Sequence, residues 1–112
     1  MKIATFNINN VNRRLPNLLR WLRAAKPDVV ALQELKSTDA DFPISAIEKA
    51  GYGAVWRGQK TWNGVAILAR KADPILIRDS LPGDPEVTGL LARAAFPPAA
   101  GPSEVTVPVL VG

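Results

Sequence analysis

The sequence predicts an α/β fold in a single domain. Apolar residues alternate over residues 3–8, recur at helical spacing over residues 15–25, and then form a short β-branched run at 28–32. A strand, a helix and a strand in this order favour two parallel strands joined by a right-handed crossover. With 112 residues, 47% of them hydrophobic, the chain can bury one modest core but not two independent ones.

The first strand and helix are the clearest elements. In the strand, Ala4, Phe6 and Ile8 share one face. The helix needs a cap and a stop: Asn12 is the expected N-cap, Pro16 is tolerated in the first turn, and Pro27 ends the helix. The apolar stripe of this helix consists of Leu15, Leu18, Leu19, Leu22 and Ala25.

The rest of the chain predicts shorter elements. Residues 28–32 suit a strand covered on both faces, and a short helix over 42–50 is stopped by Gly51. Strands over 52–57, 65–70 and 74–78 predict a meander. The last 31 residues hold six of the ten prolines and four of the eight glycines, so we expect a mostly irregular tail. Within it, 104–111 alternates enough to form an edge strand, since Pro108 disfavours a central position.

Composition excludes several classes of chemistry. Without cysteine there is no disulfide framework, thiolate nucleophile, zinc ribbon or iron–sulfur cluster, and without histidine there is no serine–histidine triad. No apolar run approaches the roughly 20 residues of a membrane span, and the early residues are too polar for a secretion signal. We therefore expect a cytoplasmic protein with no membrane partner, whose chemistry uses oxygen atoms, lysine or arginine.

Positive charge gathers at the beginning of the chain. The net charge is +4, and residues 1–36 hold seven bases against two acids, whereas residues 37–112 hold seven against eight. This excess favours an anionic partner, although a solvated outer helix face is the more common reason for bases on a helix. The candidate phosphate-contacting bases are Arg13, Arg14, Arg20, Arg23 and Lys26 in this part of the chain, together with Lys60 further on.

Polar side chains follow the two parallel strands at their carboxyl ends. Asn7 and Asn9 follow the first strand and Glu34 follows the second. The carboxyl ends of parallel strands meet at one edge, where α/β sheets usually bind ligands, so we expect these three residues to cluster. Carboxylate and amide oxygens suit Mg²⁺, with Glu34 as its main anchor. The alternative is a polar turn beside a strand that leaves the core.

Two other glycine-containing segments have some features of binding loops. Residues 58–64 look like a loop in which Trp62 beside Lys60 would stack on a base or sugar, unless Trp62 is a core residue. Gly51-Tyr52-Gly53 lacks the third glycine and the following helix of a dinucleotide site. No dinucleotide cofactor is expected.

Three segments together resemble a known family. Residues 1–10 (MKIATFNINN), 26–36 (KPDVVALQELK) and 51–68, the last containing Asn63-Gly64-Val65-Ala66-Ile67-Leu68, closely resemble bacterial exodeoxyribonuclease III. That family belongs to the endonuclease/exonuclease/phosphatase superfamily. The resemblance runs from residue 1 to about residue 85, and the three motifs occur in the family's order and spacing.

The resemblance implies a magnesium-dependent phosphodiesterase, with Mn²⁺ as an alternative ion. It implies cutting of double-stranded DNA beside abasic sites, degradation from 3′ ends, and a four-layered α/β sandwich of which this chain forms the N-terminal half. Glu34 matches the metal-binding carboxylate, Asn7 an active-site asparagine, and Asn9 a position near the metal. Residues that match or adjoin DNA-contacting segments are Arg13, Lys60, Trp62 and Asn63.

The later residues depart from the family pattern. Family members are longer, and their second half supplies motifs with an aspartate, an asparagine, a tyrosine and a histidine that are absent here. The chain has no histidine, and its one tyrosine, Tyr52, lies in another segment. We therefore expect 1–85 to be the family-like part and 86–112 a divergent Ala/Pro-rich tail, from truncation or a frameshift. The alternatives are a non-catalytic basic DNA-binding fragment and another phosphodiesterase or phosphatase of the superfamily.

Overall fold

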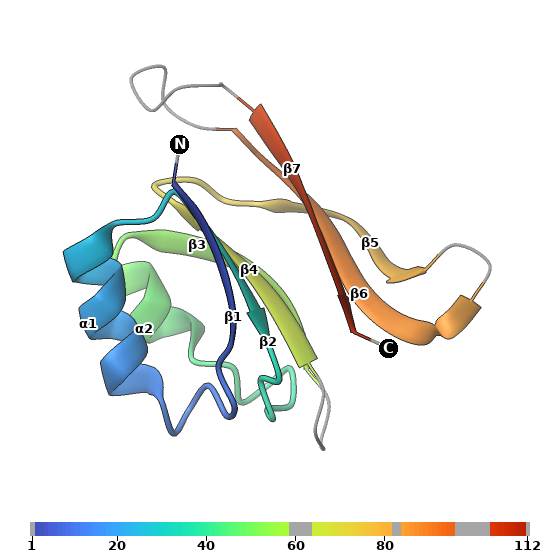
Figure 1. Ribbon diagram of the computed structural model, residues 1–112, viewed down its shortest axis with the longest axis horizontal. Coiled ribbons are helices and arrows are strands. Elements are labelled where there is room, and N and C mark those ends of the chain that lie inside the picture. The colour runs from blue at the N-terminus through green and yellow to red at the C-terminus, as the bar shows by residue number, and fades with distance from the viewer. Residues whose placement is uncertain (1, 59–63, 82–83, 96–103, 112) are drawn as a thin grey trace.

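The computed structural model describes residues 2–58, 64–81, 84–95 and 104–111, with side chains placed for residues 2–5, 7–58 and 64–76. These residues form three layers (Figure 1). Two helices cover one face of a four-stranded sheet, and a three-stranded sheet lies on the other face. The α/β prediction is confirmed.

The four-stranded sheet has the order β1-β2-β4-β3 and the second sheet the order β5-β6-β7. The first sheet contains β1 (Ile3–Asn7), β2 (Val29–Gln33), β3 (Tyr52–Gly58) and β4 (Gly64–Arg70). The helices are α1 (Leu15–Ala25) and α2 (Ile44–Lys49). The second sheet contains β5 (Ile75–Leu81), β6 (Asp84–Ala95) and β7 (Glu104–Val111).

Strands β1 and β2 are parallel neighbours, as predicted, and α1 connects them. Their register pairs Ile3 with Val29 and Asn7 with Gln33, so both strands end at the same level. Pro16 lies in the first turn of α1. The predicted N-cap is wrong: α1 begins after Arg14, without a side-chain cap, because residues 11–14 form a turn before the helix. The Asn12 side chain instead donates to the Asp41 carbonyl (3.1 Å).

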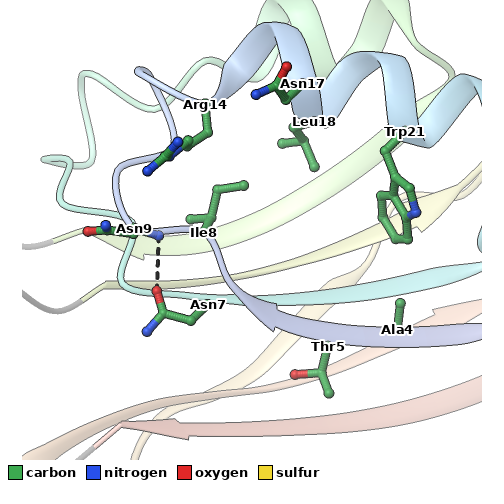
Figure 2. Close-up of a pocket in the computed structure, with 9 residues that line it drawn as sticks. All are labelled: Ala4, Thr5, Asn7, Ile8, Asn9, Arg14, Asn17, Leu18 and Trp21. Atoms are coloured by element: carbon green, nitrogen blue, oxygen red, sulfur yellow. Dashed lines mark hydrogen bonds between the residues drawn. The ribbon is translucent and has the colours of Figure 1, made fainter.

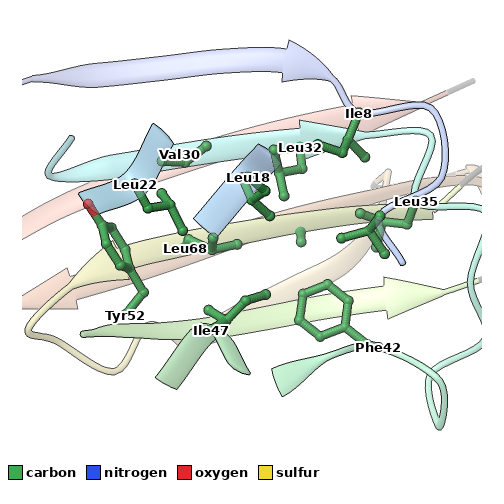
Figure 3. Packing of buried hydrophobic residues seen from close by; sticks show 12 residues of the cluster. Ile8, Leu18, Leu22, Val30, Leu32, Leu35, Phe42, Ile47, Tyr52 and Leu68 are labelled. Atoms are coloured by element: carbon green, nitrogen blue, oxygen red, sulfur yellow. The ribbon is translucent and has the colours of Figure 1, made fainter. Parts of the chain in front are cut away.

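The core lies between the helices and the four-stranded sheet (Figure 3). Strand β2 is buried on both faces from Val29 to Leu32, as its continuous apolar run predicts. Among the described helices, none combines the length and apolarity that a membrane span requires. The core cluster consists of Ile8, Val11, Leu18, Leu22, Val30, Leu32, Leu35, Phe42, Ile47, Tyr52, Ala66 and Leu68.

The predicted meander is only partly correct. Strands β3 and β4 form an antiparallel hairpin, but β4 also pairs with β2 along its length. Because both edges of β4 are occupied, β5 has no edge to join beside it and pairs with β6 in the second sheet.

The prediction of a mostly irregular tail is also wrong. Residues 84–95 form the 12-residue strand β6, which pairs with both β5 and β7. A β-ladder is held by backbone hydrogen bonds, so a strand can form without a typical strand composition. For this reason the Pro- and Ala-rich composition of the tail did not predict this strand. Strand β7 does lie at an edge, as Pro108 requires. The Pro97-Pro98 segment lies outside the described residues.

Candidate functional site

The carboxyl ends of β1 and β2 bring Asn7, Asn9 and Glu34 to one edge of the sheet. Asn7 pairs in register with Gln33, the residue before Glu34. Backbone bonds continue beyond the strands, from Ile8 N–H to the Gln33 carbonyl (3.0 Å) and from Asn10 N–H to the Glu34 carbonyl (3.0 Å). The two loops therefore leave the sheet side by side.

The polar side chains at this edge are held by short hydrogen bonds. The Asn7 Oδ1 accepts from the backbone N–H of Asn9 at 3.0 Å (Figure 2). The Asn9 Oδ1 accepts from the Lys36 Nζ at 2.5 Å. Asn7 and Asn9 are exposed and Glu34 is half-buried, so a ligand can reach all three.

Both loops carry unusual backbone conformations. The φ angles of Asn9, Asn10, Glu34 and Lys36 are +47°, +84°, +53° and +49°. Residues other than glycine adopt this left-handed region at a cost, and such strain persists where surrounding contacts impose it, often at functional sites. Here the backbone bonds between the loops impose it, and Leu35 N–H adds a bond to the Gly64 carbonyl (3.2 Å).

Two supporting contacts were not expected from the sequence. Lys36 orients Asn9, and the Gln33 Nε2 donates to the Thr5 Oγ1 at 2.9 Å. Gln33 and Thr5 lie on adjacent strands, two positions apart in register. Strand alternation places the side chains of Thr5 and Asn7 on the same face of β1. The parallel register of β1 and β2 is what brings Gln33 close to Thr5.

A pocket of about 610 Å³ opens between β1 and α1 (Figure 2). Asn7, Asn9 and Arg14 form its polar end, whereas Ile8, Leu18 and Trp21 contribute apolar surface. Glu34 does not line this pocket. The exposed Arg14 at the polar end provides a cation for an anionic group.

The remaining predicted residues are less well placed. Arg13 is exposed in the turn before α1, and its N–H donates to the Asn10 Oδ1 (3.2 Å). Lys60, Trp62 and Asn63 lie outside the described residues. The strand residues that flank them are anchored near Glu34. Gly58 N–H donates to the Asp39 carboxylate (2.5 Å), and the Gly64 carbonyl accepts from Leu35.

The donor set at the edge fits a hard divalent cation. Glu34 supplies a carboxylate, and Asn7 and Asn9 supply amide oxygens, which suit Mg²⁺ held with water and phosphate oxygens. Over the described residues, no group of three or more His, Cys, Asp or Glu side chains is placed to hold a metal ion, so a cation at this edge relies on one carboxylate together with amide, water and phosphate oxygens.

The layered α/β fold is that of a known protein family. The chain belongs to the endonuclease/exonuclease/phosphatase family, whose model matches residues 4–100. Among curated proteins it is similar to exodeoxyribonuclease III of Haemophilus influenzae, with 41% identity over 86 residues. That match covers 77% of this chain and 32% of the relative.

Solved structures give a consistent result. The chain is similar to a 3′–5′ exonuclease from Neisseria meningitidis, with TM-score 0.70, 41% identity, and coverage of 82% of this chain and 37% of that one. It is also similar to an AP endonuclease from Archaeoglobus fulgidus, with TM-score 0.70, 37% identity, and coverage of 86% and 37%. The chain thus spans about a third of the length of these relatives.

Proposed function

We propose that this chain provides the metal-binding edge of a DNA repair nuclease that hydrolyses phosphodiester bonds with Mg²⁺. The observation that carries the proposal is the meeting of Asn7, Asn9 and Glu34 at one strained, accessible edge. Support comes from relatives named as exodeoxyribonuclease III, a 3′–5′ exonuclease and an AP endonuclease, at 37–41% identity. The proposed substrate is double-stranded DNA with abasic sites or 3′ ends.

In this proposal Glu34 holds the cation. The Asn7 and Asn9 amide oxygens each already accept one hydrogen bond, so either adds a ligand only through its second lone pair. When bound, Mg²⁺ acts as a Lewis acid that polarises the phosphate and offsets its developing charge. Lys36 holds the Asn9 amide through its 2.5 Å hydrogen bond. The Asn7 Oδ1 is bonded to Asn9, which leaves the Asn7 Nδ2 to donate to a phosphate oxygen.

The chain has few side chains that could transfer a proton during hydrolysis. The sequence has no histidine, and its one tyrosine, Tyr52, is buried with its hydroxyl donating to the Pro27 carbonyl (2.6 Å). Tyr52 is therefore not available to a substrate. This observation favours a second candidate function, a basic DNA-binding module that does not cleave.

Incision of an end-labelled duplex with one abasic site tests the proposal. We expect slow cutting that requires Mg²⁺ and is lost in Glu34→Gln, because the variant keeps the shape of the side chain but removes its charge. Glu48→Gln, at an exposed position on α2, is the matched control and should cut like the parent chain. Equal cutting by Glu34→Gln would refute the role of Glu34, and salt-sensitive binding without any cutting would favour the DNA-binding module.

A further inference from the structure

We propose a second anion-binding site, specific for a phosphate group, in a groove at the end of the sheet opposite Glu34. The groove has a volume of about 280 Å³ and lies where α1 ends, β3 begins and β4 ends. Four cationic residues, Arg23, Lys26, Arg70 and Lys71, line it, and no acidic residue does. This site is separate from the one proposed above and does not depend on nuclease activity.

The cations of the groove are largely uncompensated. Within the described part of the chain, the side chains of Arg23, Lys26 and Lys71 form no ion pair or hydrogen bond. Arg70 binds the Asp28 carboxylate through Nη2 (2.9 Å), but its side chain remains 30% exposed. Its buried Nε has no hydrogen-bond partner among the described residues. Asp28 pairs with Arg70, and Glu48 and Asp73 line an adjoining pocket that shares Lys71 with the groove. The lining of the groove itself carries four positive charges and no negative one.

The backbone holds the two lysines in place. Lys26 and Lys71 have left-handed φ angles of +47° and +54°. Lys26 N–H donates to the Leu22 carbonyl (3.1 Å), and Lys71 N–H donates to the Gly51 carbonyl (2.8 Å). The backbone of Lys26 is therefore fixed to the last turn of α1, and that of Lys71 to the residue before β3. Such preorganisation lowers the ordering cost of binding a ligand.

The groove offers donors and positive charge, so its ligand is an anion. A guanidinium beside ammonium groups matches the several oxygens of a phosphate, which accept charge-assisted hydrogen bonds. The carboxyl end of α1 adds a partial negative charge of about half a unit, less than the charge of one lysine. Free inorganic phosphate and the backbone of a nucleic acid both present such phosphate oxygens.

The groove and the Glu34 edge cannot bind the same phosphate. Asp28, beside the groove, and Glu34 flank the two ends of β2. Six residues of extended chain span about 20 Å. A nucleic acid bound to both places would therefore contact them through different phosphates.

Titration of the 112-residue chain with inorganic phosphate, followed by backbone amide NMR, tests the site without metal. We expect the amide signals of Lys26, Gly51 and Lys71 to shift. The double variant K26Q/K71Q should bind phosphate about tenfold or more weakly, because two of the four cations are removed. The charge-matched control R20Q/K49Q, from exposed positions outside the groove, should bind as the parent does. No shifts, or equal weakening in both variants, would overturn the proposal.

A second titration, with a short DNA duplex in the presence of a chelator, identifies the source of the phosphate. If the duplex shifts the same amides, K26Q/K71Q should also lower the salt dependence of binding by about one phosphate contact per lysine. If only inorganic phosphate shifts them, the groove takes a small phosphate. Either result supports the site. The Glu34→Gln variant should show the same amide shifts as the parent chain. The phosphate site can therefore be confirmed even if the nuclease proposal fails.

Discussion

Asp28 and Arg70 form an ion pair of 2.9 Å at the amino end of β2. The other carboxylate oxygen of Asp28 accepts from the backbone N–H of Lys2 (2.7 Å), and the Asp28 carbonyl accepts from Arg70 N–H (2.9 Å). One residue thus joins the ends of β1, β2 and β4. The Asp28 side chain is only 10% exposed, so these bonds are shielded from water.

Replacing this carboxylate should give a pH-dependent loss of stability. The Lys2 N–H bond and then the Arg70 guanidinium hold the pKa of Asp28 below its ordinary value of 3.8. A lowered pKa stabilises the folded state above that ordinary value, and the contribution is lost as pH falls through the lowered one. We expect Asp28→Asn to be less stable by about 2 kcal/mol at neutral pH, with the difference shrinking below pH 3.8.

Urea unfolding of both proteins across this pH range measures the effect. Glu48→Gln, which removes an exposed carboxylate, is the control and should change stability little at any pH. A constant difference between Asp28→Asn and the parent at all pH values would contradict the linkage.

Tyr52 offers a second titration, because it is the one tyrosine of the sequence. Burial raises its pKa to about 12, and its hydroxyl donates to the Pro27 carbonyl. The protonated form is therefore favoured in the folded state. This contribution to stability is complete below pH 10, the ordinary value, and declines as pH rises toward 12.

Near-ultraviolet absorbance of the tyrosinate reports this ionisation directly. We expect ionisation near pH 12 in the folded chain and near pH 10 in urea. Tyr52→Phe should cost about 1 kcal/mol by leaving a carbonyl unpaired. Ionisation near pH 10 in the folded protein would show that the hydroxyl is not buried.

Gly58 should tolerate no side chain. A Cβ there would collide with the Ser37 carbonyl oxygen and lie 2.6 Å from the Thr38 carbonyl carbon, both backbone atoms. We expect Gly58→Ala to destabilise the chain by about 2 kcal/mol, through overpacking. Gly51→Ala is the comparison, because Gly51 has open space around it and only its φ of +93° opposes a side chain. Thermal unfolding should place Gly58→Ala below Gly51→Ala, and the reverse order would contradict the packing argument.

Metal binding should stabilise the chain independently of catalysis. A ligand that binds only the folded state at about ten times its dissociation constant adds about 1.4 kcal/mol. We expect Mg²⁺ to raise the melting temperature of the parent and of Glu48→Gln, but not of Glu34→Gln. Equal stabilisation of Glu34→Gln would place the cation elsewhere.

Local patterns in the sequence predicted the first half of the fold well. The alternation of residues 3–8 and the stripe from Leu15 to Ala25 depend on neighbours in the chain, and the parallel pair follows from their order. The same reasoning brought Asn7 and Glu34 to one edge, because parallel strands end together. It failed at Asn12, since the residue that begins a helix depends on the turn before it.

The sequence by itself determined the parallel β1–β2 pair, its connecting helix and the oxygen-rich edge, because these follow from periods of two and 3.6 residues. Only the tertiary structure decided that β4 inserts between β2 and β3, that residues 84–95 form a strand, and that Lys36 holds Asn9. It also gathered Arg23, Lys26, Arg70 and Lys71 around one groove. Strand partners and side-chain contacts of this kind join residues distant in the chain, and local periodicity carries no information about which distant residues meet.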